Sequence, residues 1–253
     1  MTLQELQRIA ESVGERQGWD FSRVRDDCDP VPWDYAGVVR RYLAPSHRVL
    51  DIGTGGGERF LALAPYLGAG VGIDPDPTMI QVARQNRPSS LTTQVSFEVM
   101  GAEALQFPGD SFDVVLNRHA PIDVKEVIRV LRPQGFFITQ QVGAKNTQNI
   151  CALFGCEPGG EYESDPSQDI AALAKAFQQN GCALIARAEY NIHYWFCDVE
   201  SFVFWLKAIP LPQDLDLNKH WRQISRAITD YHTPRGIETN EHRELLIVQK
   251  LPA

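Results

Sequence analysis

Residues 49–57 read Val-Leu-Asp-Ile-Gly-Thr-Gly-Gly-Gly, and this stretch decides the fold of the chain. A short apolar strand ends in an acid, Asp51, and leads into a turn in which Gly53, Gly55 and Gly57 alternate. Glycine is needed where the backbone takes a positive φ or approaches a ligand closely. An apolar helical pattern follows the turn. The stretch therefore predicts the strand, turn and helix that bind a cofactor in a doubly wound α/β sheet.

The spacing of the glycines narrows the choice of cofactor. It is G-x-G-x-G and not the G-x-G-x-x-G of dinucleotide enzymes, because Glu58 stands in the place of the third glycine. An acid at the end of the strand, Asp51, suits a ligand that carries an ammonium group better than one that carries a pyrophosphate. Both features favour S-adenosylmethionine and count against NAD.

A second acid stands where a ribose-binding residue is needed. Residues 71–74 read Val-Gly-Ile-Asp, which is another apolar strand that ends in a carboxylate, Asp74. The acid lies roughly 20 residues past the glycine turn, the distance at which it can reach ribose hydroxyls. From residue 47 to residue 143 strand and helix patterns alternate, which predicts βαβ units and a parallel sheet.

Further segments follow in an order that identifies a family. Residues 97–105 are a strand and a loop, 110–117 are a strand, and 130–138 are a helix end followed by a strand. Together with the two acids and the glycine turn, they resemble the motifs of class I S-adenosylmethionine-dependent methyltransferases over residues 46–143. Gln134 departs from the family, which more often has glycine there.

The resemblance implies a fold, a cofactor and a set of binding residues. The fold is a Rossmann-like, doubly wound, mostly parallel sheet of seven strands with an antiparallel last strand. The cofactor is S-adenosyl-L-methionine, the product is S-adenosyl-L-homocysteine, and no metal is needed. Asp74 would take both ribose hydroxyls, and Ala102 and Glu103 would meet the adenine edge. The implied cofactor-binding residues are Asp51, Gly53, Thr54, Gly55, Gly57, Asp74, Pro75, Met79, Gly101, Ala102, Glu103 and Asn117.

The loop after the predicted fourth strand supplies the candidate catalytic residue. It reads Asn-Arg-His-Ala-Pro over residues 117–121 and lacks the Asn-Pro-Pro-Tyr of enzymes that methylate base amines. His119 could take a proton from an acceptor, or it could only hydrogen-bond the loop. Trp33 and Tyr35, with His119, are candidates for the substrate pocket, and the alternative for each aromatic is core packing.

Helical patterns at both sides of the core predict a cap. The expected divisions are an N-terminal helical cap segment over 1–45, a cofactor-binding core over 46–197, a helical cap insertion over 198–235 and a closing strand of the core over 236–253. Ile209-Pro210-Leu211-Pro212 interrupts the insertion, so that two helices are expected there. We expect the cap to cover the C-terminal edge of the sheet.

The charge and the composition of the chain disfavour some classes of binding partner. The chain has 253 residues, a net charge of −8 and no basic run longer than Arg40-Arg41. Phosphate neutralisation supplies most nucleic-acid affinity, so an acidic chain disfavours nucleic acid. The five cysteines lack a C-x-x-C pair, which favours reduced thiols in a cytoplasmic protein. No apolar run is long enough to span a membrane. The oligomeric state is left open.

The leading interpretation is a methyltransferase that acts on a small molecule by direct in-line transfer. Methylation of rRNA, tRNA or a protein is the first alternative. A non-catalytic protein that binds S-adenosylmethionine is the second, because an intact cofactor site indicates binding only. An NAD-dependent oxidoreductase is the third, and the missing glycine counts against it.

Overall fold

The computed structural model describes residues 1–16, 18–156, 169–209, 211–212 and 214–252 of the chain. Its internal contacts divide the chain into two units. The first unit is made of residues 1–31, 143–165 and 190–242. The second unit is made of residues 32–142, 166–189 and 243–253. All residues that the sequence predicts for the site belong to the second unit.

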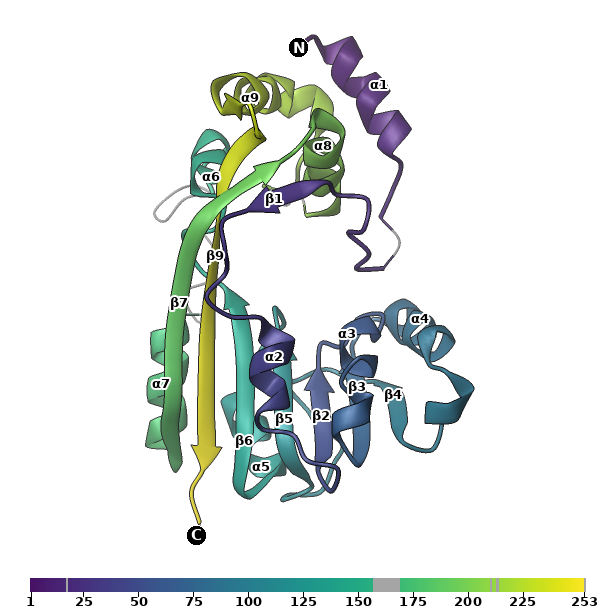
Figure 1. Cartoon of the computed structure of the whole chain (residues 1–253), viewed down its shortest axis with the longest axis vertical. Helices are drawn as coiled ribbons and strands as arrows, with labels where there is room; N and C mark the ends of the chain where they lie inside the picture. Colours follow the sequence, from purple (N-terminus) through teal and green to yellow (C-terminus); the bar gives the residue numbers. More distant parts are fainter. Residues whose placement is uncertain (17, 157–168, 210, 213, 253) are drawn as a thin grey trace. The chain divides into compact units, whose positions relative to one another are not determined.

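The strands of the described residues form one sheet in the order β1-β7-β9-β6-β5-β2-β3-β4, with β8 paired to β9 (Figure 1). The strands of the N-terminal half are β1 (Asp26–Cys28), β2 (Arg48–Ile52), β3 (Ala69–Asp74), β4 (Val95–Val99) and β5 (Phe112–Arg118). The later strands are β6 (Leu131–Val142), β7 (Cys182–Phe196), β8 (His232–Thr233) and β9 (Gly236–Lys250). Strands β7 and β9 have residues in both units.

The pairing confirms the predicted fold class. Strands β3 and β5 both pair with β2 in parallel, β4 is parallel to β3, and β6 is parallel to β5. The last long strand, β9, is antiparallel to β6, as the family resemblance implies. Nine strands are present among the described residues instead of seven, because the short β1 and β8 are added to the predicted set.

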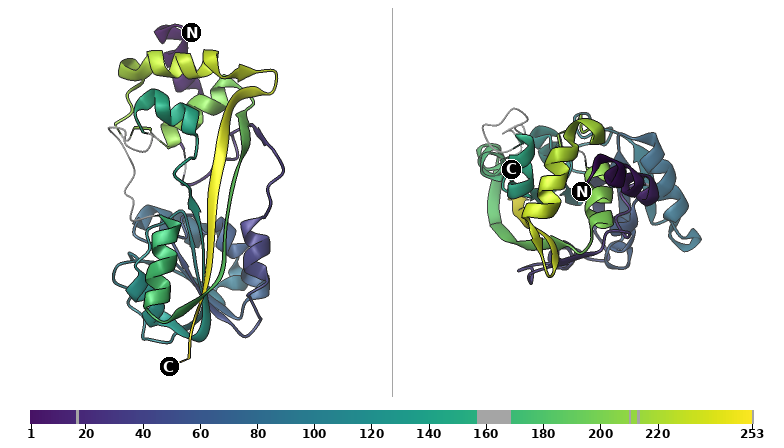
Figure 2. Two further views of the ribbon diagram at one scale, coloured as in Figure 1. Left: turned by 90° about the vertical axis from the view of Figure 1, so that its left-hand side faces the viewer. Right: turned by 90° about the horizontal axis from the view of Figure 1, so that it is seen from above.

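Helices cover both faces of the sheet in the second unit, as the left view of Figure 2 shows. One face packs against α5 (Val124–Val130) and α7 (Ile170–Gln179), around Phe137 and Phe177, whose rings stack at 4.9 Å. The other face packs against α2 (Tyr35–Arg40), α3 (Glu58–Leu61) and α4 (Pro77–Asn86), around Phe60 and Phe97. Two short 3₁₀ turns, Ala64–Tyr66 and Ser89–Leu91, lie in the connections.

Aspartates start four of these helices. The side chains of Asp34, Asp76, Asp123 and Asp169 accept backbone N–H groups in the first turns of α2, α4, α5 and α7. Such caps satisfy donors that have no partner inside the helix. Since α4 follows β3 and α5 follows β5, two of these caps fix the far ends of loops that begin at the carboxyl ends of the parallel strands.

The first unit is mainly helical. It holds α1 (Leu3–Val13), α6 (Gln148–Phe154), α8 (Val199–Ala208) and α9 (Leu217–Asp230), packed around the buried Phe196 and Phe202. The predicted interruption between the two helices of 198–235 is present, since α8 ends at Ala208 and α9 begins at Leu217. Lys207 donates to the carbonyl oxygens of Ala10 and Gly14 at 2.8 Å each, which fastens the end of α1 to α8.

The residues before the core differ from the expectation. Strand β1 stands in a stretch, residues 26–34, whose prolines and acids are typical of a turn, and its three residues are exposed. It pairs antiparallel with the end of β7, where Asp26 faces Phe196.

Among the described residues, no helix has the length and the apolar character that a membrane crossing requires.

Candidate functional site

The strand order places the expected binding site at one point of the sheet. From β2 the chain proceeds to β3 and then to β4, and it returns with β5 on the other side of β2. In open α/β sheets, ligands bind at the carboxyl ends of the strands where the order reverses in this way. Here that point lies between the ends of β2 and β5, which carry the glycine turn and the His119 loop.

Hydrogen bonds tie the glycine turn to the neighbouring strand. The backbone N–H groups of Gly53 and Thr54 both donate to the carbonyl of Ile73 at 2.9 Å. The N–H of Gly55 donates to the Asp74 carboxylate, Oδ2, at 3.0 Å. Gly53, Gly55 and Gly57 have φ values of 75°, 55° and 76°, which are left-handed conformations that favour glycine. The alternating glycines therefore allow the backbone to form one tight turn, which these hydrogen bonds to Ile73 and Asp74 close.

Asp74 holds two loops at once. Its Oδ1 accepts the N–H of Asp76 at 3.0 Å, and its backbone carbonyl accepts the N–H of Met100. The side chain is buried, with 8% of its surface exposed. Each carboxylate oxygen has two lone pairs, so acceptor sites remain for hydroxyl groups of a ligand.

Asp51 is the acid at the end of β2, and its carboxyl group is largely desolvated. Burial raises the pKa of Asp51 to about 7, and the nearby Asp74 carboxylate acts in the same direction. The Thr54 hydroxyl and the positive charge of Arg118 act against this rise. A buried carboxylate that is expensive to ionise gains the most when a cation arrives beside it.

Further residues that are expected to bind the cofactor lie after β3 and β4, and Ala102 and Glu103 are those expected to meet the adenine. Pro75 is exposed and Met79 is half-buried in the first turn of α4. Gly101 and Ala102 are half-buried, and the exposed Glu103 folds its carboxylate back over Gly101, where a Cβ atom would collide with it.

The loop after β5 is held by a buried polar network. Asn117 is fully buried, and its side-chain oxygen accepts from Gln141 Nε2 at 2.7 Å and from Thr139 Oγ1 at 3.1 Å. Its side-chain nitrogen donates to the carbonyl of Pro121 at 3.1 Å. The amide of Asn117 is thus engaged inside the protein, where it fixes the course of the loop. Its expected contact with the cofactor stays a prediction.

His119 stands in this loop with a φ of 57°. Its N–H donates to the carbonyl of Gln140 at 3.0 Å, and its side chain keeps access to solvent. Partial desolvation by the surrounding protein lowers the pKa of His119, and the charges of Arg118, Arg243 and Arg59 add to this effect; the access to solvent reduces the size of this shift. The lowered pKa keeps the imidazole neutral, so that it can accept a proton, but it also makes His119 a weaker base than an ordinary histidine.

Trp33 and Tyr35 are brought to the ends of β5 and β6. Tyr35 OH contacts the backbone carbonyls of Asn117 at 3.0 Å and Ile138 at 3.1 Å. Burial raises the pKa of Tyr35, so its hydroxyl stays protonated. Trp33 Nε1 donates to Gln140 Oε1 at 3.1 Å. Both aromatic side chains are half-buried, and their role in a substrate pocket stays a prediction.

Sequence reasoning missed Gln140 and Arg118. A signal was present, since Thr139, Gln140 and Gln141 are consecutive polar residues that directly follow the apolar run Phe136-Phe137-Ile138 of a strand. Polar groups at the carboxyl end of a central strand are typical of a binding site or of a buried network.

The groups at this site fit S-adenosylmethionine. A half-buried acid ends β2, where an ammonium group can reach it, and a second acid ends β3, where a ribose can reach it. Backbone of three left-handed glycines lies between the two acids, which leaves Thr54 as the one side chain of the turn over residues 53–57. Whether the reaction needs a metal is not tested by this arrangement, and the expectation that it needs none stays a prediction.

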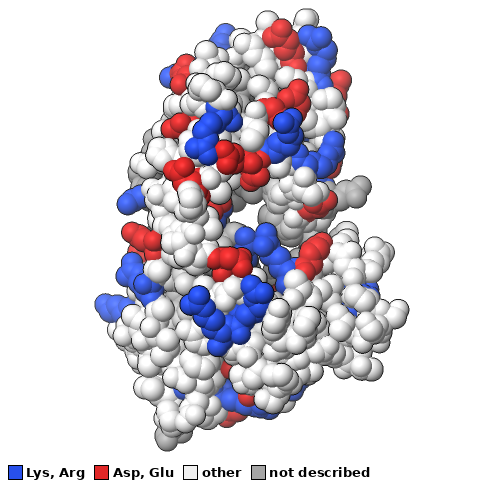
Figure 3. Space-filling model, viewed as in Figure 1, with Lys and Arg blue, Asp and Glu red and all other residues white. Residues whose placement is uncertain are grey.

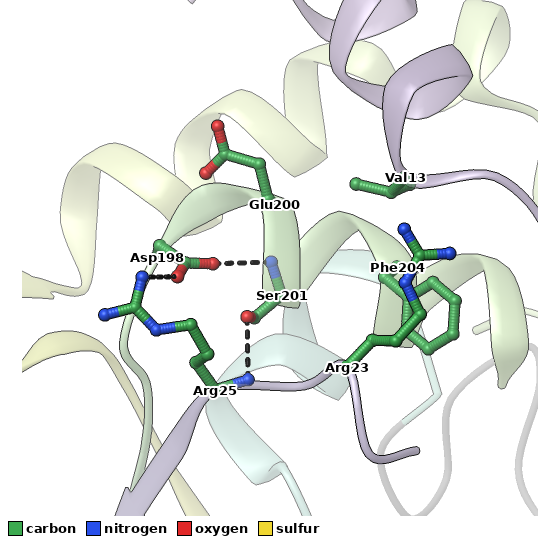
Figure 4. A pocket seen from close by; sticks show the side chains of 7 residues that line it. All are labelled: Val13, Arg23, Arg25, Asp198, Glu200, Ser201 and Phe204. Atoms are coloured by element: carbon green, nitrogen blue, oxygen red, sulfur yellow. Dashed lines mark hydrogen bonds and ion pairs between the residues drawn. The ribbon is translucent and has the colours of Figure 1, made fainter. Parts of the chain in front are cut away.

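A hollow of about 390 Å³ lies on the first unit, and Figure 4 shows its lining. Its polar groups bind one another: Arg25 pairs with Asp198 at 3.0 Å and donates its N–H to Ser201 Oγ at 2.9 Å. Arg23 lies over the ring of Phe204, 5.5 Å from its centroid. These contacts are those of a packed helix start and add no group suited to the predicted chemistry.

Comparison with known proteins agrees with the site. A family described as a methyltransferase domain matches residues 43–170. The uncharacterised methyltransferase YcgJ of Bacillus subtilis is 39% identical over 99 residues, which are 36% of this chain and 39% of that protein. The ribosomal protein L11 methyltransferase of Pelobacter propionicus is 40% identical over 120 residues, which are 43% of this chain and 36% of that protein.

Another relative is matched over a longer range. The ubiquinone biosynthesis O-methyltransferase of Agrobacterium fabrum is 32% identical over 160 residues, 57% of this chain and 64% of that protein. The chain thus spans about two fifths of the first two relatives and less than two thirds of the third.

Solved structures share the fold. The crystal structure of YcgJ superposes with a TM-score of 0.61 at 23% identity and covers 87% of this chain and 99% of that one. This likeness shows the fold, and the family match over 43–170 spans the acid, the glycine turn and the second acid of the site. The chain belongs to the methyltransferase-domain family, the class I S-adenosylmethionine-dependent methyltransferases.

Proposed function

We propose that the protein transfers the methyl group of S-adenosylmethionine directly to a small-molecule acceptor. The observation that carries the proposal is the glycine turn between two strand-end acids, in which Gly55 is bonded to Asp74 while Asp51 stands half-buried on the next strand. When bound, S-adenosylmethionine supplies an activated methyl group. The protein has to bind it, orient the acceptor and exclude water.

The small-molecule acceptor is supported by charge and by one relative. The net charge of −8 disfavours a polyphosphate partner, and on the face in Figure 3 basic and acidic side chains are interspersed without a continuous basic surface. The Agrobacterium relative acts in ubiquinone biosynthesis, while the Pelobacter relative methylates a ribosomal protein. A protein or RNA acceptor is therefore the alternative that any test has to include.

His119 is the candidate for moving a proton. Its neutral imidazole lies at the end of β5, and it would take the proton of a hydroxyl or thiol acceptor as the methyl group arrives. An acceptor that arrives already deprotonated would need no base.

Two measurements test the proposal. Calorimetric titration should show binding of S-adenosylhomocysteine and no binding of NAD, and NAD binding of equal strength would overturn the assignment of the cofactor. Methyl transfer from S-adenosylmethionine labelled on the methyl group should then be found with small molecules. Label that appears only in RNA or protein would replace the small-molecule acceptor. Binding without transfer to any of them would indicate a non-catalytic binder.

Asp51 should make cofactor binding depend on pH. Its pKa of about 7 means that the carboxyl is largely protonated below neutrality, and the ammonium group of the ligand then has to displace a proton. Affinity for S-adenosylhomocysteine should fall as pH falls below about 7, by up to about tenfold for each pH unit. The check is calorimetry between about pH 5.5 and about pH 7.5.

The Asp51→Asn variant is the matched control. It removes the titrating group with little change of shape, so it should bind more weakly at pH 7.5 and lose this dependence on pH. A slope that persists in the variant would assign the titration to another group.

A further inference from the structure

Gln140 is a buried residue whose side-chain amide offers a donor group to a ligand. It lies on β6 with 5% of its surface exposed. Its side-chain oxygen accepts from Trp33 Nε1 at 3.1 Å. Among the described residues, no group accepts from its side-chain nitrogen. The amide nitrogen keeps contact with solvent, so a ligand can reach it.

The orientation of this amide is fixed by chemistry. The indole N–H of Trp33 can only donate, so it has to meet the oxygen of the Gln140 amide and not the nitrogen. The two N–H bonds therefore point away from Trp33. The backbone carbonyl of the same residue holds His119, whose N–H it accepts at 3.0 Å. Gln140 thus presents two donors beside the loop of the candidate base.

A positive charge lies next to these donors. Arg118 on β5 is paired in register with Gln140 on β6, and residues in register on neighbouring strands point to the same face of a sheet. The charge of Arg118 also reaches Asp51 and His119, because it lowers the pKa of both groups. An arginine and an amide N–H₂ side by side are complementary to the two oxygens of a carboxylate.

We propose that Gln140 and Arg118 bind the carboxylate of the methyl acceptor, so that the acceptor is a small organic acid. The inference rests on the proposed function and names the substrate class of the same site. The carboxylate of the cofactor itself is the competing source. It sits on the same carbon as the ammonium group that Asp51 would bind, whereas β6 is two strands from β2, about 10 Å away. This distance favours the acceptor.

The test uses protein loaded with S-adenosylhomocysteine and a panel of hydroxybenzoic and small aliphatic hydroxy acids, each beside its methyl ester. In calorimetry, at least one acid should bind the wild type at least about tenfold more tightly than its ester, a difference of about 1.4 kcal/mol. If no acid is preferred over its ester, the proposal is overturned.

The decisive variant is Gln140→Glu, which keeps an oxygen for Trp33 and replaces the donors with a negative charge. It should lose the preference for the acid. The matched control is Gln178→Glu, which adds the same charge on the exposed side of α7 and should keep the preference. If Gln140→Glu does not fold, Gln140→Met takes its place in the test, because it removes the donors without adding a charge. A preference that survives in Gln140→Glu or Gln140→Met would show that Gln140 does not bind the carboxylate.

Titration with the cofactor product separates the remaining outcomes. Gln140→Glu should bind S-adenosylhomocysteine as the wild type does. If the affinity of Gln140→Glu for S-adenosylhomocysteine falls about tenfold while its affinity for 5′-methylthioadenosine, which has no carboxylate, is unchanged, then Gln140 and Arg118 bind the carboxylate of the cofactor and not that of the acceptor. If the wild type does not bind S-adenosylhomocysteine at all, the proposed function has failed, and the acid–ester comparison without ligand still reports on the carboxylate site.

Discussion

Replacing Gly55 with valine is expected to abolish cofactor binding while the protein still folds. Gly55 has a φ of 55°, and its N–H donates to the Asp74 carboxylate at the centre of the turn. A left-handed conformation costs a residue with a side chain roughly 1–2 kcal/mol, and β-branched residues are outliers there. The valine side chain would also occupy space where backbone is expected to meet the ligand. We expect affinity for S-adenosylhomocysteine to fall at least about 100-fold in calorimetry.

Gly181 offers the matched control for backbone strain. It has a φ of 83°, and an added Cβ atom would have no neighbour within 4 Å. Gly181→Val therefore brings a comparable conformational cost without filling the turn, and it should lower the melting temperature but leave affinity unchanged. If Gly55→Val binds within about threefold of the wild type, the turn is not the cofactor site.

The local signals of the sequence were sufficient for the framework of the site. Each of Asp51 and Asp74 follows an apolar run of strand length, and alternating glycines follow the first. These signals depend on neighbours in the chain, so the structure places β2, β3 and the turn where the pattern predicts them. The antiparallel last strand came from the family resemblance, because local pattern does not determine the direction of pairing.

Features set by distant residues could not be predicted in this way. Strand β1 has three exposed residues, Asp26–Cys28, and it exists because β7 presents an edge to it. The pair Trp33 and Gln140 is separated by 107 positions in the chain. Asn117 matches a family position for cofactor binding, yet the partners of its amide are Thr139 and Gln141, which the sequence could not place beside it.

The same distinction explains why the acceptor was harder to predict than the cofactor. The cofactor is expected to meet backbone and two acids that the chain supplies within 25 residues, from Asp51 to Asp74. The acceptor side would be built from separate segments, with Trp33 before α2, Arg118 on β5 and Gln140 on β6. Only the folded structure brings these side chains together.

Replacing Asp74 with alanine should weaken cofactor binding at least about tenfold and up to about 100-fold. The carboxylate is expected to make charge-assisted hydrogen bonds to the ribose hydroxyls, each worth roughly 1.5–3 kcal/mol. It also anchors the N–H groups of Gly55 and Asp76 at 3.0 Å each. A loss of affinity by itself would therefore not separate contact with the ribose from support of the turn.

A cycle of variant protein and altered ligand makes this separation. The wild type should bind S-adenosylhomocysteine more tightly than an analogue that lacks one ribose hydroxyl, whereas Asp74→Ala should bind both alike, since the partner of that hydroxyl is gone. Asp76→Ala is the control: Asp76 is an exposed neighbour whose carboxylate caps α4, so its loss should cost about 1 kcal/mol of stability and no affinity. If Asp74→Ala still distinguishes the two ligands as strongly as the wild type does, another group binds the ribose, and Asp74 only supports the turn.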